Sequence, residues 1–323
     1  MYLRGMKTFF LALVWVSALC GDGKMPEDSL RLMFWNLENF FDWKNDSTGV
    51  SDAEFSSRGQ RRWTRKRFQA KADAIAKTLL WAASKEGGLA DVIGFAEVEN
   101  RFVLKRLLSE TALRKLDYRI VHFDSGDPRG IDVALLYRPS RLELVKATPC
   151  RLYQADSTLL PTRDILLAEL RAPGGDTVAF LVNHHPSKYG GAAVSDARRL
   201  IAVERLRTLA DSLTHRRVVA MGDFNDTPAN PVYKRLEPAL RNLAEPLHRK
   251  GEGSIRYQGK WELIDMFFVS PGSGASAMKV LHVPFLTARD KSYSGEKPLR
   301  TYSGPRYLGG VSDHCPIWLN LKE

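Results

Sequence analysis

The chain alternates between short apolar runs of strand length and longer segments whose apolar residues recur at helical spacing. Eight runs predict strands, because each holds a mainly apolar block bounded by polar or turn-forming residues. They are residues 31–36, 91–97, 131–138, 164–171, 177–185, 217–225, 263–269 and 309–321. Several of these runs carry a carboxylate, an amide or an imidazole near an end, which a purely structural strand does not need.

Three segments between the runs predict helices. Thr64 is a residue type that caps helix N-termini, and apolar residues from Phe68 to Leu79 form one stripe behind it. A shorter helix is expected after Asn100. Another is expected after Ser195, with apolar residues at the i, i+3, i+4 and i+7 positions.

The order of these elements predicts an α/β class. The runs 164–171 and 177–185, joined by APGGD, indicate a hairpin, so the sheets are expected to be mixed rather than purely parallel. Long apolar strands with helices between them predict sheets covered by helices. Residues 28–323 contain no linker long enough to divide them, so we expect one domain. The long polar segments 44–60 and 287–310 are expected to wall a cleft.

Residues 1–20 have the layout of an export signal. Arg4 and Lys7 precede an apolar run, Phe9–Val16, that is too short to span a bilayer, and small residues follow it. Cys20 could instead be the acylated first residue of a lipoprotein, which would anchor the protein peripherally to a membrane. We therefore expect an exported protein that is periplasmic, extracellular or an outer-membrane lipoprotein.

Charge and cysteine content narrow the picture further. The chain has a formal net charge of +11 and a sequence pI near 9.6, which favours polyanionic partners such as nucleic acid, anionic lipid or phosphorylated small molecules. A basic surface that only maintains solubility is the alternative. Besides Cys20, only Cys150 and Cys315 are present, too few for a disulfide framework or a thiolate zinc site. We expect both to be buried or to form one bridge.

The polar residues near the strand ends form the candidate site. They are Asn36, Glu97, His184, Asp223, Asn225, Asp265, Asp313 and His314. Asp223 and Asn225 are two positions apart in an extended segment and should face the same spot. Oxygen ligands without a thiolate suit Mg²⁺, with Mn²⁺ or Ca²⁺ as alternatives. Open sheets place their sites beside strand ends, so we expect these side chains to converge around one cation.

Taken in order, seven segments resemble the endonuclease/exonuclease/phosphatase superfamily, which has the deoxyribonuclease-type fold, and in particular its exported bacterial branch. The segments are FWNLENFF, GFAEVEN, RGIDVALLYR, VNHHPSK, MGDFNDTP, LIDMFFV and GVSDHCPIWL, and the match runs from about residue 30 to residue 321. The resemblance implies a four-layer α/β/β/α sandwich, in which two mixed β-sheets pack face to face with helices on the outer faces.

The resemblance also implies a divalent metal site. Glu97 would be the chief ligand, with Asn36 and Asp313 close by. Many members of the superfamily have Gln immediately before the metal-binding glutamate, whereas this chain has Ala96.

A second set of residues would act on water and phosphate according to the same resemblance. Asp223 would position or deprotonate the attacking water, assisted by Asn225. His314, oriented by Asp265, would contact the scissile phosphate, and His184 would contact it from the other side. The division of general-base work between aspartate and histidine stays open.

Four further residues are predicted to contact substrate, namely Arg61, Arg62, Asp132 and Asn183. The first two lie in segment 56–71, which holds seven cations and no acid. It could track phosphates with Trp63 as a stacking platform. The alternative is a solvated helix start, although cations there oppose the helix dipole. Asp132 could line the pocket or pair with Arg129.

These observations favour an exported, divalent-metal-dependent phosphodiesterase, specifically a nuclease that hydrolyses DNA or RNA by metal-assisted in-line attack of water. The alternative keeps this chemistry but changes the substrate to phospholipid head groups or small phosphorylated molecules. A non-catalytic protein of the same fold is disfavoured, because the residue set is complete. We expect a monomer.

Overall fold

A computed structural model describes residues 29–46, 49–187 and 191–322. The predicted export signal, residues 1–20 with Cys20, lies outside the described residues. In the part of the chain that is described, no helix combines the length and the apolar character needed to cross a membrane.

Two six-stranded mixed sheets form the centre of the fold. The first sheet has the order β13 (Lys279–Val280), β18 (Ile317–Lys322), β1 (Ser29–Phe40), β2 (Val92–Val98), β4 (Asp132–Tyr137) and β3 (Arg119–His122). The second has the order β5 (Glu143–Cys150), β6 (Ile165–Arg171), β7 (Thr177–His184), β8 (Arg217–Asp223), β12 (Asp265–Val269) and β9 (Arg241–Asn242). Strands β1 and β2 are parallel, as are β7 and β8, and the other neighbours are antiparallel.

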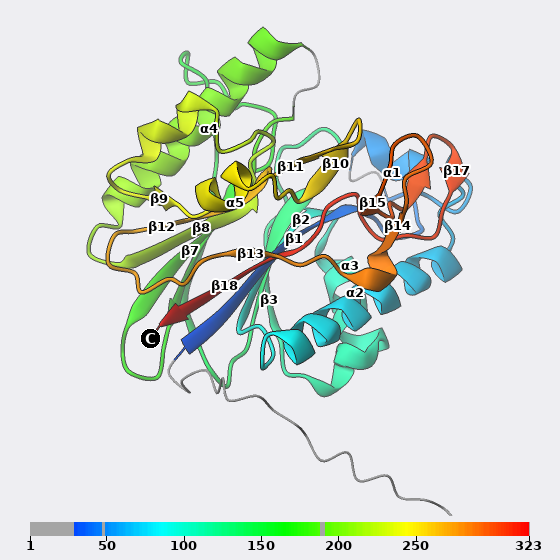
Figure 1. Ribbon diagram of the computed structural model, residues 1–323. Helices are drawn as coiled ribbons and strands as arrows, with labels where there is room; N and C mark the ends of the chain where they lie inside the picture. The colour runs from blue at the N-terminus through cyan, green and yellow to red at the C-terminus, as the bar shows by residue number, and fades with distance from the viewer. Residues whose placement is uncertain (1–28, 47–48, 188–190, 323) are drawn as a thin grey trace, which may run out of the picture.

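Helices cover the outer faces of the two sheets (Figure 1). The α-helices are α1 (Val50–Glu54), α2 (Arg65–Lys85), α3 (Arg101–Glu110), α4 (Ala192–Ser212) and α5 (Glu245–Arg249), with short 3₁₀ helices at Ala112–Lys115, Pro231–Leu236 and Pro284–Leu286. Helices α2 and α3 pack on the first sheet, and α4 packs on the second. The predicted four-layer sandwich is therefore confirmed.

Alternation along β1 shows how the sequence specifies these layers. Leu32 and Phe34 belong to the core that contains the second sheet, whereas Met33 and Trp35 belong to the core under α2 and α3. Successive side chains of a strand point to opposite faces, so a strand buried on both sides needs an unbroken apolar run. The run 31–36 supplies one.

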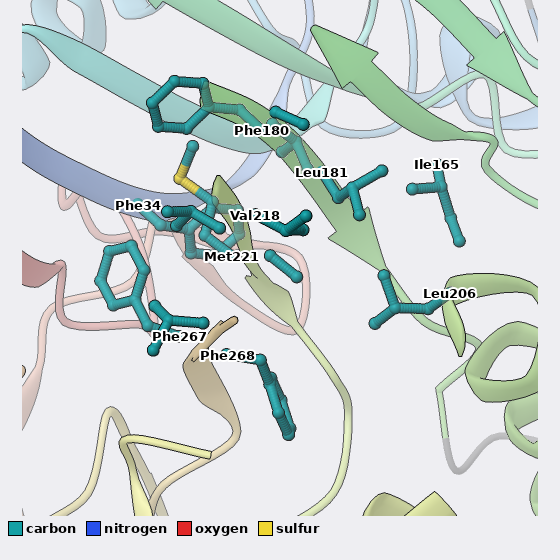
Figure 2. Close-up of a cluster of buried hydrophobic side chains, with 14 of the residues drawn as sticks. Phe34, Ile165, Phe180, Leu181, Leu206, Val218, Met221, Phe267 and Phe268 are labelled. Atoms are coloured by element: carbon teal, nitrogen blue, oxygen red, sulfur yellow. The ribbon is translucent and has the colours of Figure 1, made fainter. Parts of the chain in front are cut away.

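Gly94 of β2 faces the second sheet at close range. A Cβ atom at this position would lie 3.0 Å from the sulfur of Met221 and 3.0 Å from the ring of Phe34. Figure 2 shows Phe34 and Met221 side by side in this core, with Phe267 and Phe268 of β12 nearby. A side chain at residue 94 would therefore meet the packed core between the sheets.

Most predicted elements are present, with three shifted boundaries. Helix α2 begins after Thr64, whose Oγ1 accepts a hydrogen bond from the Arg67 backbone N–H. Helix α4 begins at Ala192 rather than after Ser195, because Gly191 is its N-cap residue. Strand β8 ends at Asp223, and β18 starts only at Ile317.

The two long polar segments contain local structure of their own. Segment 44–60 includes α1, and segment 287–310 includes the hairpins β14 (Thr287–Arg289)–β15 (Glu296–Pro298) and β16 (Tyr302–Ser303)–β17 (Arg306–Tyr307). Another hairpin, β10 (Ile255–Tyr257)–β11 (Lys260–Glu262), precedes β12.

Two expectations about individual residues are settled by burial. Trp63 is fully buried and donates from its indole N–H to the Phe41 carbonyl over 2.8 Å, so the predicted stacking platform at Trp63 is wrong. A sequence cannot distinguish an exposed ring from a buried one inside a basic segment. Cys150 and Cys315 are both buried free thiols. Of the two expectations for them, burial is therefore confirmed, and they do not form a bridge.

Candidate active site

Three strand-end residues lie in a row across the second sheet. Asp223 ends β8, His184 is its register partner on the parallel strand β7, and Asp265 is its partner on the antiparallel strand β12. All three are buried. Register alone therefore brings together residues that are far apart in the sequence.

His314 reaches this row from the loop before β18. Its Nδ1 lies 2.7 Å from Asp265 Oδ2, and its Nε2 lies 3.8 Å from Asp223 Oδ2. His184 Nε2 lies 3.6 Å from the same oxygen of Asp223. The backbone N–H of His314 donates to Ser312 Oγ, and Ser312 donates to the Asn36 carbonyl, so the loop is held against β1.

The pKa values of the two imidazoles that face Asp223 are shifted in opposite directions. Burial lowers the pKa of His314, but the charges of Asp265 and Asp223 outweigh it and raise this pKa well above its usual value. Burial and the nearby Arg163 hold the pKa of His184 well below its usual value. Burial raises the pKa of Asp223 to about 7, with Asp265 adding to the effect and His314 opposing it. A carboxylate with a pKa near neutrality suits proton transfer.

The first sheet contributes Asn36 to this cluster. Its Nδ2 donates to Asp223 Oδ2 over 2.9 Å, and its Oδ1 accepts from the Glu38 backbone N–H over 2.9 Å. This fixes the orientation of the amide and couples the edges of the two sheets.

Asn225 approaches Asp223 through its backbone rather than its side chain. Its N–H donates to Asp223 Oδ1 over 2.9 Å, while its side-chain amide donates to the His185 carbonyl over 2.8 Å. Asn225 has a φ of 54°, so the chain leaves the extended conformation and the two side chains do not face one spot as the alternation argument predicts.

Glu97 sits in a bulge of β2. The pairing of β2 with both β1 and β4 shifts register around it, and its φ is 59°. Such bulges redirect side chains beside active sites, at a cost of about 1–3 kcal/mol for the strained residue. The carboxylate accepts from the Asn39 backbone N–H over 2.8 Å, and Arg129 Nη2 lies 3.4 Å from it.

Asp313 lies on the same side of the molecule as Glu97. Arg300 Nη2 is 3.0 Å from Asp313 Oδ2, and Arg300 Nε donates to Glu38 over 2.9 Å. The charges of Glu97 and Asp313 both raise the pKa of Arg300, and both act on the buried Lys71. The two predicted metal ligands therefore share one electrostatic neighbourhood.

The donor types at this edge fit a hard divalent cation, because Asn36, Glu97 and Asp313 offer only oxygen. A carboxylate has more lone pairs than the hydrogen bonds described above use. Among the described residues, however, Glu97 and Asp313 do not form a close group with a third acidic or histidine ligand. Each pairs with an arginine instead, Arg129 and Arg300 respectively.

Within the described ranges, three groups bring His, Asp or Glu ligand atoms within 4.8 Å of one another: Asp223–Asp265–His314, His122–Asp124–Asp132 and Asp46–Asp52–Glu99. The second group contains the predicted pocket residue Asp132. It is buried, its Oδ2 lies 3.2 Å from His122 Nε2, and it is a lining residue of a cavity of about 490 Å³. The alternative partner, Arg129, contacts Glu97 and Asn39 rather than Asp132.

The remaining predicted substrate residues occupy different environments. Asn183 is fully buried and donates to the Leu181 carbonyl, so the structure gives it no open face for substrate. Arg61 is partly exposed, donates to Glu54 over 2.7 Å, and lines a cavity of about 110 Å³ together with Arg300. Arg62 is exposed at the surface of the same segment.

Sequence reasoning missed Glu38, Lys71 and Arg300. Lys71 donates to the Glu38 carbonyl and to Thr301 Oγ1, and burial lowers its pKa to about 8. Burial and the charge of Asp313 raise the pKa of Glu38 to about 7. The sequence did contain a signal for this group. Lys71 falls on the apolar side of α2, and a buried lysine needs a buried polar partner such as Glu38.

Residues 31–323 match the Endonuclease/Exonuclease/phosphatase family. The fold is similar to an endonuclease/exonuclease/phosphatase family protein of Bacteroides thetaiotaomicron (19% identity, 91% of this chain and 97% of that one, TM-score 0.58). It is also similar to a mannosyl-6-phosphatase of that organism (15%, 90% and 99%, 0.57) and to D. rerio TDP2 complexed with a single-strand DNA product (15%, 92% and 100%, 0.55). A search of curated proteins finds no match. The chain belongs to the endonuclease/exonuclease/phosphatase family and is a metal-dependent phosphoester hydrolase.

Proposed function

We propose that the protein is an exported phosphodiesterase that uses a divalent metal and acts as a nuclease on DNA or RNA. The observation that carries the chemistry is the buried cluster in which Asp223 Oδ2 lies 3.8 Å from His314 Nε2 and 3.6 Å from His184 Nε2. Such a cluster combines an acceptor for a water proton with donors for developing negative charge on phosphate.

Each residue then has a role that follows from its contacts. Asp223 accepts a proton from the attacking water, and Asn36 holds its carboxylate in place. His314 offers its Nε2–H to a phosphoryl oxygen, because its Nδ1 is bonded to Asp265. Glu97, Asn36 and Asp313 would hold Mg²⁺ or Mn²⁺, which when bound polarises a phosphoryl oxygen.

Charge supports a polyanionic diester as the substrate. The chain carries a net +11, and Arg61 and Arg300 line a cavity beside Asn39, a neighbour of Glu97. The similarity to D. rerio TDP2, which was crystallised with a single-strand DNA product, is consistent with this assignment. The similarity to a mannosyl-6-phosphatase supports the second candidate, a phosphatase of small phosphorylated molecules. Export rests on the residue pattern of 1–20.

A substrate panel tests the proposal. The purified protein is given bis-p-nitrophenyl phosphate, p-nitrophenyl phosphate, mannose 6-phosphate, single- and double-stranded DNA, and RNA, each with Mg²⁺, Mn²⁺ or a chelator. We expect diester and polynucleotide cleavage that the chelator abolishes. Cleavage of monoesters alone would replace the nuclease with the phosphatase, and diester cleavage in the presence of chelator would overturn the mechanism.

A further inference from the structure

The hairpin β10–β11 is attached to the active-site histidine. Ile255 forms a β-bridge with His314, and the Cys315 backbone N–H donates to the Ser254 carbonyl over 2.7 Å. Tyr257 lies two residues further along the strand, about 7 Å from the level of His314. The hairpin is thus a fixed wall beside the reacting centre.

The turn of this hairpin is tightly specified. Tyr257 pairs with Lys260 across a two-residue loop, and both loop residues, Gln258 and Gly259, have positive φ values of 45° and 79°. This is the pattern of a type I′ turn, whose twist matches that of the flanking strands. The ring of Tyr257 is therefore presented from a rigid support.

A second hairpin, β14–β15, packs against the first (Figure 1). The Arg256 guanidinium donates to the Gly259 carbonyl in its own hairpin and to the Ser294 and Glu296 carbonyls in the second. Tyr293 lies directly against the turn, since a Cβ atom on Gly259 would be 2.8 Å from its ring. Tyr293 of the second hairpin thus contacts the turn that follows Tyr257 in the first.

Both tyrosines face solvent with cations around them. Tyr257 is 59% exposed and Tyr293 is 47% exposed, although each ring could bury substantial apolar area. Residues 255–262 and 287–298 carry five cations and three acids, and Lys260, Arg289 and Lys291 are exposed. Exposed aromatic rings among basic side chains are the features that bind single-stranded nucleic acid.

We propose that these two hairpins form a stacking platform on which Tyr257 and Tyr293 hold the bases of a single strand that runs through the active site. This deepens the nuclease assignment and rests on it. Bases within a duplex have little free ring face, so the platform selects single-stranded substrate or frayed ends. The nearby cations contact the phosphates between the stacked bases.

The test is the binding of a fluorescent oligothymidylate in chelator, where no cleavage occurs. Tyr257→Ala and Tyr293→Ala are each expected to weaken binding by about fivefold or more, and Tyr257→Phe to preserve it, because stacking uses the ring face. Tyr153→Ala, at a tyrosine that is 51% exposed in the segment after β5, is the matched control and should not change affinity. An oligonucleotide of abasic residues should bind equally to all four variants.

Several outcomes would overturn the platform. These are unchanged affinity in both hairpin variants, equal losses with Tyr153→Ala, or equal losses with the abasic strand. Tyrosine-dependent binding to anionic phospholipid vesicles without oligonucleotide binding would assign the hairpins to a membrane instead. Hydrolysis of bis-p-nitrophenyl phosphate, which has no base to stack, separately reports the proposed chemistry. If the protein binds the oligonucleotide but does not hydrolyse bis-p-nitrophenyl phosphate, the proposed nuclease activity is rejected. The stacking platform then stands as a binding site only.

Discussion

Asn36 Nδ2 donates a hydrogen bond to Asp223 Oδ2 over 2.9 Å, from the first sheet to the second, with both side chains buried. The bond joins the edges of the two sheets, between which apolar side chains pack. The Asp223 carboxylate also faces the imidazoles of His184 and His314. Substitution of Asp223 is therefore the most direct test of the site.

Asp223→Asn is expected to lower the rate of bis-p-nitrophenyl phosphate hydrolysis by about 10²–10⁴-fold, because an amide cannot accept the water proton. The fold should be retained, since the replacement keeps the shape of a buried side chain. Rate measurements with circular dichroism as the folding check test this. A variant with full activity would exclude Asp223 from proton transfer.

Asp265→Asn is expected to move the alkaline limb of the activity profile to lower pH. Asp265 helps to raise the pKa of His314, so its neutralisation lets the imidazolium lose its proton earlier. We expect kcat/KM to fall by about 10²-fold or more, and a pH series of kcat/KM checks both effects. An unchanged alkaline limb would contradict the assigned role.

The hydrogen-bonded pair of Asp265 and His314 also predicts how the stability of the protein depends on pH. The folded-state pKa of His314 lies above the usual histidine value of 6.5. Its stabilising contribution is therefore complete below about pH 6.5 and is lost as the pH rises through the folded-state value. Denaturant unfolding across this range should show a smaller loss in Asp265→Asn than in the wild type.

Glu97→Gln is expected to weaken Mn²⁺ binding by about tenfold or more, because loss of a ligand should cost at least as much as loss of a supporting residue. Isothermal titration calorimetry measures the affinity independently of activity. Glu143→Gln, which removes a largely exposed carboxylate on β5, is the control. Equal affinities in the two variants would place the metal elsewhere.

Gly94→Ala is expected to destabilise the protein by about 1–3 kcal/mol, because the new methyl group meets Met221 and Phe34 between the sheets. Gly174→Ala, in the turn before β7 with nothing within 4 Å of its Cβ, should change stability by less than about 0.5 kcal/mol. Urea unfolding compares the two. Similar values would mean that the sheets can separate at little cost.

Much of the fold and of the candidate site can be predicted from the apolar runs of the sequence and the polar residues at their ends. The apolar blocks at 31–36, 91–97 and 217–225 predict β1, β2 and β8. The register of β7, β8 and β12 then aligns the polar ends. The patterns alone predict mixed sheets covered by helices, whereas the family resemblance implies the four-layer sandwich, and the structure confirms both.

Other features depend on geometry that a single sequence does not encode. The positive φ of Asn225 turns its side chain away from the spot that strand alternation predicts. The pairing of Asp132 with His122 follows from strands β3 and β4 lying side by side. Trp63 was assigned to the surface because its neighbours are basic, although its ring fills the core beneath α2.

The pairing of β18 with β1 links catalysis to the order in which the chain is made. Asn36 belongs to the first strand of the fold, while Asp313 and His314 immediately precede the last one. A ribosome-bound chain that stops before Asp313 lacks both of the late side chains, and one that stops before β18 lacks the strand that holds them beside Asn36. The proposed chemistry therefore becomes possible only once β18 has been made and has paired with β1.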